Sequence, residues 1–193
     1  MKITIVSLAL WLLICSCGNN ASEAAKETPV EKSYFPIAEY VKGEIRIVDS
    51  LPVGIMKKFK KGSRMDSSFI ERPEFHTLAG AFTDTNLGKS NLEANYKESS
   101  FMDQSTGYYT FTYQPITPSA PYNRIDVLVK PGANSDKVST IYMEKSSVQQ
   151  DTTINERLFW KANTSFSITR EKKFKEQNPV VEQLIVIWDP LSY

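Results

Sequence analysis

The chain has 193 residues, with 23 Lys and Arg, 22 Asp and Glu and one His, so its formal net charge at pH 7 is +1. A nucleic-acid-binding domain normally carries a strongly basic face, so this balance argues against a nucleic-acid partner. Both cysteines lie within the first 17 residues, so the rest of the chain lacks the several Cys and His ligands of the usual zinc sites.

The first predicted element is an apolar N-terminal segment. Residues 3–15 form an apolar run of thirteen residues behind Lys2, which as a helix would reach about 20 Å. That is too short for a hydrocarbon core of about 30 Å, so a cleaved secretory signal over 1–16 is expected. We expect cleavage after the small residue Ser16. Cys15 is a poor alternative for the first residue after cleavage, because Ile14 would then occupy the position that requires a small residue.

The run Ile14-Cys15-Ser16-Cys17 resembles the lipobox of bacterial lipoprotein signals. The resemblance implies that Cys17 carries diacylglycerol and an N-acyl chain, whereas Cys15 leaves with the signal. Two or three acyl chains, at about 0.8 kcal/mol per buried methylene, would anchor the chain stably to a membrane. A plain secretory signal with a chance cysteine and an uncleaved signal anchor remain alternatives.

A flexible tether is predicted over 17–33, because these residues have little apolar content and no sustained period. Its root-mean-square reach is about 20–24 Å. Residues 34–193, about 160 in number, suffice for one globular domain with its own core. In lipoproteins of the Bacteroidota, an acidic cluster after the lipidated cysteine resembles a signal for export to the cell surface. Gly18-Asn19-Asn20 contains no such cluster. We therefore favour the outer membrane, with the domain facing the periplasm.

Two main helices are predicted in the first half of the domain. The first covers 34–48, where apolar residues recur at spacings of four, four and three: Ile37, Val41, Ile45 and Val48. The second begins at Pro73 and continues through Phe75, Leu78, Ala79 and Phe82, at i, i+3, i+4 and i+7. Strands are expected at 53–60 and 64–70, with a turn at 61–63, and a short helical turn at 87–94.

Residues 57–64 contain five basic side chains in eight positions. Beside a lipid tether they could rest on anionic headgroups, at about 1 kcal/mol for each charge near the surface. The favoured interpretation is simpler, namely the solvated face and tip of a strand that ends at Gly62.

From residue 95 the period of apolar residues changes to two. A hairpin over 95–116 is expected to turn at Ser105-Thr106-Gly107, where Gly107 can take positive φ. Further strands are predicted at 124–130, 137–145, 153–162, 165–172 and 181–188. Their short connections require antiparallel neighbours. The predicted fold is α+β: a curled antiparallel meander of about seven strands in the C-terminal half, with the two helices covering one face.

The residue types do not suggest an enzyme, a cofactor or a metal. His76, the only histidine, is expected on the exposed surface of the second helix, and no G-x-S-x-G elbow or phosphate-binding glycine loop is present. Carboxylates at Asp66, Glu98, Asp103 and Asp126 leave a two-carboxylate hydrolase as a remote hypothesis.

Aromatic side chains in the strands have two interpretations, which are core packing beneath the helices and the lining of a cavity for an apolar ligand. Tyr109 and Trp160 are the candidates for such a lining. Asp49-Ser50-Leu51 and Asp151-Thr152-Thr153 resemble the short O-glycosylation pattern of exported Bacteroidota proteins. Thr152, expected in a turn, is the candidate site.

Five stretches together, "YFPIAEYVKGEIRIVDSLPVGIMK", "FMDQSTGYYTFTY", "DVLVKPG", "VSTIYMEKSS" and "RLFWKANTSFSITRE", resemble a group of uncharacterised envelope lipoproteins of the Bacteroidota. The resemblance implies an envelope lipoprotein and assigns no role to any residue. The sequence therefore predicts a membrane-anchored, non-enzymatic domain that binds a protein or envelope component. A carrier of an acyl chain or other apolar ligand is the alternative.

Overall fold

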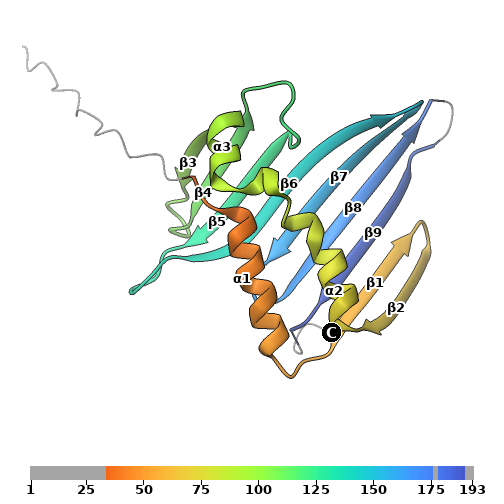
Figure 1. Ribbon diagram of the computed structural model, residues 1–193, viewed down its shortest axis with the longest axis horizontal. Helices are drawn as coiled ribbons and strands as arrows, with labels where there is room; N and C mark the ends of the chain where they lie inside the picture. The colour runs from red at the N-terminus through yellow and green to blue at the C-terminus, as the bar shows by residue number, and fades with distance from the viewer. Residues whose placement is uncertain (1–33, 176–177, 190–193) are drawn as a thin grey trace, which may run out of the picture. The chain divides into compact units, whose positions relative to one another are not determined.

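The computed structural model describes residues 34–175 and 178–189 (Figure 1). These residues belong to one compact unit that begins at Ser33. The predicted signal peptide (1–16), the cleavage site after Ser16, the lipidation site Cys17 and the tether (17–33) lie outside the described residues.

Helices precede most of the strands along the chain. In order, the elements are α1 (Ile37–Ser50), β1 (Ile55–Lys61), β2 (Arg64–Ile70), α2 (Arg72–Ala79), the 3₁₀ turns η1 (Gly80–Phe82) and η2 (Thr85–Leu87), α3 (Lys89–Asn95), β3 (Tyr96–Met102), β4 (Tyr109–Pro115), β5 (Arg124–Lys130), β6 (Lys137–Gln149), β7 (Thr152–Lys161), β8 (Ser165–Phe174) and β9 (Val180–Ile187).

In the part of the chain that the structure describes, all strands join one antiparallel sheet of nine, ordered β2-β1-β9-β8-β7-β6-β5-β4-β3. The α+β class and the seven-stranded meander, β3 to β9, are confirmed. The difference is the β1–β2 hairpin, which extends the same sheet by pairing β1 with β9, for example Met56 opposite Ile187. This pairing joins opposite ends of the domain, so no local sequence pattern could predict it.

The two faces of the sheet have different surroundings, because successive side chains of a strand point to opposite faces. The helices lie on one face (Figure 1), which we call the inner face. Its buried side chains form one core with those of the helices, and they include Ile125, Val127, Ile141, Met143, Leu158, Trp160, Phe166, Ile168 and Val186. We call the opposite face the outer face.

Helix α1 packs on the inner face through a stripe that differs from the predicted one by one residue. Ile37, Val41 and Val48 are buried as expected, but the position between them is taken by Glu44, whereas Ile45 is only partly buried. A hydrogen bond accounts for the buried position of the Glu44 carboxylate. Glu44 Oε2 accepts a hydrogen bond of 2.9 Å from the backbone N–H of Asn163, in the β7–β8 turn.

Replacing Glu44 with alanine is expected to lower the free energy of unfolding by about 1–3 kcal/mol, because the Asn163 N–H loses its acceptor. Equilibrium urea denaturation measures the change. The matched control is Glu39→Ala, on the same helix but exposed, which should change stability by less than about 0.5 kcal/mol. Equal losses in the two variants would contradict this role for Glu44.

Helix α2 and turn η1 contribute Phe75, Ala79 and Phe82 to the core as predicted, with Leu78 partly buried. Phe82 meets Trp160 edge-on, with ring centroids 5.2 Å apart, and Trp160 stacks on Phe166 at 5.4 Å. Aromatic packing of this kind fastens the helices to strands β7 and β8.

Candidate binding surface

The predicted ligand-lining residues do not lie together. Trp160, on β7, is fully buried in the aromatic cluster, and its Nε1 has no hydrogen-bond partner within the described chain. Tyr109, on β4, is 37 % exposed and lies opposite Val129 of β5. Strands β5 and β6 separate β4 from β7, so these two aromatic side chains belong to different parts of the inner face.

The residues considered for catalysis are also dispersed. His76 is exposed on α2 as predicted, and its Nε2 lies 2.8 Å from Asp49 Oδ1 of α1, a partner that the sequence did not indicate. The four carboxylates do not form a group. Asp66 and Glu98 lie on opposite edge strands, β2 and β3, Asp126 lies on β5, and Asp103 accepts hydrogen bonds from Ser105 and Thr106.

Within residues 34–175 and 178–189, no three His, Cys, Asp or Glu side chains gather in a way that could hold a metal ion. No helix of these residues is both long and apolar enough to cross a membrane. Thr152, the candidate glycosylation site, is half-buried as the first residue of β7, directly after the turn.

The outer face gathers polar side chains from many strands into continuous rows. One row, which we call the central row, places residues of six neighbouring strands directly opposite one another: Lys60 (β1), Gln183 (β9), Thr169 (β8), Arg157 (β7), Glu144 (β6) and Arg124 (β5). Adjacent strands are about 4.8 Å apart, so the row is about 24 Å long. A surface of this extent can contact a long ligand.

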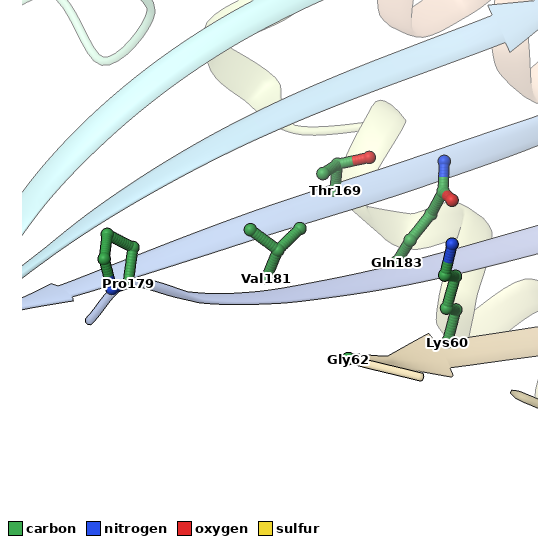
Figure 2. Close-up of a pocket in the computed structure, with 6 residues that line it drawn as sticks. All are labelled: Lys60, Gly62, Thr169, Pro179, Val181 and Gln183. Atoms are coloured by element: carbon green, nitrogen blue, oxygen red, sulfur yellow. The ribbon is translucent and has the colours of Figure 1, made fainter. Parts of the chain in front are cut away.

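Two hollows lie along the central row. The first has a volume of about 400 Å³ and is lined by Lys60, Gly62, Thr169, Pro179, Val181 and Gln183. Figure 2 shows the side chains of Lys60, Gln183, Thr169 and Val181 side by side, projecting from β1, β9 and β8. Gly62 is in the β1–β2 turn with φ of 60°, a conformation that favours glycine.

The second hollow, of about 260 Å³, is lined by the outer-face residues Glu144, Ser146, Asn155, Arg157 and Glu171, by Asn123, and by Lys145 and Glu156, whose strand positions belong to the inner face. A chain of hydrogen bonds crosses its floor, from Asn123 Nδ2 to Ser146 (3.0 Å), from Ser146 Oγ to Asn155 (2.9 Å) and from Asn155 Nδ2 to Glu171 (3.2 Å). The bond from Asn155 and the ammonium of Lys173 lower the pKa of the Glu171 carboxyl. These interactions hold the lining side chains in place.

The outer face carries an excess of positive charge. On the described strands, its positions hold nine cations and three carboxylates, namely Lys58, Lys60, Lys97, Arg124, Lys130, Lys137, Arg157, Lys161 and Lys173 against Asp126, Glu144 and Glu171.

The three carboxylates are engaged inside the chain. Asp126 pairs with Arg124 (2.7 Å), Glu171 pairs with Lys173 (3.3 Å), and Glu144 accepts from the Tyr142 hydroxyl. Six of the nine cations have no ion pair or cation–π contact within the described residues: Lys58, Lys60, Lys97, Lys137, Arg157 and Lys161. Five of these charges are available to an anion from outside, whereas Arg157 lies directly opposite Glu144 and helps to lower the pKa of Glu171, so its charge is partly offset within the chain.

The inner face is different, because each of its cations on β1, β6 and β8 is paired. Opposite charges there alternate across five neighbouring strands in the order Lys145, Glu156, Arg170, Glu182 and Lys61, which we call the ionic row. Glu156 pairs with Lys145 (3.0 Å) and Arg170, and Glu182 pairs with Lys61 (2.8 Å) and Lys172 (2.9 Å). Lys57, the last of the inner-face cations on these three strands, pairs with Glu74 of α2. The ionic row therefore leaves little free charge.

The ionic row predicts that stability falls as the pH is lowered. Burial alone would raise the pKa of Glu156, but hydrogen bonds from Arg170 and Lys145 outweigh it and lower that pKa below its ordinary 4.5; Lys61 and Lys172 lower the pKa of Glu182. A folded-state pKa below the unfolded value means that the ionised form contributes stability above about pH 4.5, and that this contribution is lost as the pH falls through the folded-state pKa. Urea midpoints between pH 7 and pH 3 should therefore decrease.

The double variant Glu156→Gln, Glu182→Gln serves as the comparison for that titration. At pH 7 its urea midpoint should be lower than that of the parent protein, and between pH 7 and pH 3 the midpoint should decrease by less. Parallel curves for the two proteins would contradict the contribution of the ionic row.

The central row is not predictable from the sequence, because its residues come from six strands and only the register brings them together. The local signal in β7 was weak, because polar Asn155 and Arg157 lie on either side of the charged Glu156, so the polar-apolar alternation is interrupted there. Neither a protein-family model, nor a curated protein, nor a solved structure matches this chain.

Proposed function

We propose that this chain is a membrane-anchored, non-enzymatic binding protein of the bacterial envelope, and that its outer face binds an envelope component. Lipidated Cys17 would hold it at the outer membrane on the periplasmic side. The tether of residues 17–33 would let the domain reach its partner near the membrane surface.

The observation that supports this function best is the contrast between the two faces of the sheet. Three helices and the ionic row occupy the inner face, whereas the outer face combines two hollows with six cations that have no ion pair among the described residues. Electrostatic complementarity steers a charged partner to such a surface.

Affinity capture from intact envelopes of the native cell tests the proposal. The full-length protein should recover a specific component, and the charge-reversed variant Lys60→Glu, Arg157→Glu should recover at least tenfold less. The control variant Lys42→Glu, Arg46→Glu makes the same change of charge on the exposed surface of α1 and should recover as much as the parent protein.

Two outcomes would contradict the proposal. One is recovery that the two double variants reduce equally, which would mean that only overall charge matters. The other is turnover of an envelope substrate by the purified protein without any captured partner.

A carrier of an acyl chain or another apolar ligand is the second hypothesis. It is favoured by the aromatic core between sheet and helices and by the buried Trp160 Nε1 without a hydrogen-bond partner. Native mass spectrometry of the unlipidated protein tests it, because a carrier purified from cells should retain bound lipid. A consistently empty protein would exclude this hypothesis.

A further inference from the structure

The chemistry of the central row specifies the kind of partner more closely, on the premise that the outer face is the binding surface proposed above. Lys60 and Arg157 are separated by three strand intervals, about 14 Å. Between them lie two neutral residues, Gln183 and Thr169. Gln183, Thr169 and Lys60 form no side-chain hydrogen bond or ion pair among the described residues, and Arg157 forms none either, although its charge helps to lower the pKa of Glu171.

Gln183 and Thr169 offer both donors and acceptors to a ligand. An amide side chain can donate two hydrogen bonds and accept others, and a hydroxyl can do both, which suits the neutral hydroxyl groups of a sugar. The two cations suit negatively charged groups farther along the same ligand. The row is therefore complementary to a polymer in which negatively charged groups alternate with neutral hydroxyl groups.

An aromatic surface adjoins the row. Phe159, on β7 two residues beyond Arg157, is 37 % exposed and lies opposite Tyr142 of β6 and Ser167 of β8. A partly exposed ring beside hydrogen-bonding groups offers apolar area to the C–H face of a sugar ring. A ligand that has only charged groups would make no use of it.

Two other partners fit less well. A peptide that binds by strand addition needs an unpaired strand edge, but the strands beneath the row from β1 to β5 are paired on both sides. A flat bilayer surface would meet the cations but could not fill the hollow in which Gln183 and Thr169 lie.

We propose that the outer face binds an extended acidic polysaccharide, with anionic groups at Lys60 and Arg157 and sugar hydroxyls at Gln183 and Thr169. Affinity should fall with increasing salt, because binding releases counterions from the polymer. Neutral sugar units between the charges contribute affinity that does not depend on salt.

Isothermal titration calorimetry tests the proposal with the chain from residue 17 onward, carrying Cys17→Ser. The probes are polygalacturonate and dextran sulfate, unmodified dextran as the neutral polymer, and vesicles that contain phosphatidylglycerol. Both acidic polymers should bind, and dextran should bind at least tenfold more weakly. Vesicles that bind more tightly than both acidic polymers would overturn the proposal in favour of a membrane surface.

Three variants assign the contacts. Lys60→Gln, Arg157→Gln should weaken binding of the acidic polymers at least tenfold and reduce the dependence on salt. Thr169→Ala, Gln183→Ala should weaken it about three- to tenfold with the salt dependence unchanged, a result that nonspecific attraction to a basic surface would not give. Lys42→Gln, Arg46→Gln should have no effect.

Two outcomes overturn the polysaccharide assignment, and the first of them leaves the binding function of the outer face intact. If neither acidic polymer binds but the outer face still captures an envelope component, the polysaccharide assignment is overturned and the binding function stands. If the four substitutions on the central row leave polymer binding unchanged, the assignment is overturned as well.

Discussion

Replacing Trp160 with alanine is expected to lower the free energy of unfolding by about 3–5 kcal/mol, because the substitution opens a cavity in the centre of the aromatic cluster. Trp160 is fully buried and contacts rings from β8 and η1. A loss of this size is a large part of the total free energy of unfolding, which is typically about 5–15 kcal/mol for a domain. Urea denaturation followed by circular dichroism measures it.

The neighbouring residue provides a matched control. Phe159 adjoins Trp160 on β7 but points to the outer face and is 37 % exposed, so Phe159→Ala should cost about 1 kcal/mol or less. If Trp160→Ala does not fold, Trp160→Phe should still cost more than Phe159→Ala. The reverse order would contradict the assignment of the two faces.

Replacing Cys17 with alanine is expected to move the protein from the membrane fraction to the soluble fraction, because the proposed acyl chains provide the anchor. Metabolic labelling with radioactive palmitate should mark the parent protein and not the variant. The urea midpoint of the folded domain should be the same in the Cys17→Ala variant and in the parent protein.

Cys15→Ala is the control for this experiment, since Cys15 is expected to leave with the signal peptide. It should retain both the label and the membrane fractionation. An unlabelled parent protein, or a Cys17→Ala variant that fractionates with membranes as the parent does, would contradict the lipid anchor.

The sequence predicted those parts of the fold that depend on local patterns. Alternation along β4 predicted a strand, and Gly107 has the positive φ expected at the β3–β4 turn. The position of Glu44 in the stripe of α1 was missed, because a charged residue at a helical spacing normally indicates the solvent side. Its inward position depends on the Asn163 N–H, more than a hundred residues away.

The candidate surface could not be predicted from spacing, for a related reason. Lys60 and Gln183 come together only because β1 pairs with β9, and the register of that pair is set by long-range packing. A shift of one residue would turn Lys60 toward the helices. The basic stretch 57–64 was visible in the sequence, but the way its cations divide between the two faces was not. Lys57 and Lys61 form ion pairs on the inner face, where Arg64 also lies, and among the described residues Lys58 and Lys60 on the outer face form none.

Site-specific photocrosslinking in living cells tests most directly whether the outer face is the binding surface. A photoreactive residue at Thr169, in the first hollow, should form a crosslinked adduct with an envelope component, whereas the same residue at Lys42 on α1 should not. Adducts from Lys42 and none from Thr169 would place the partner on the helical side and contradict binding at the outer face.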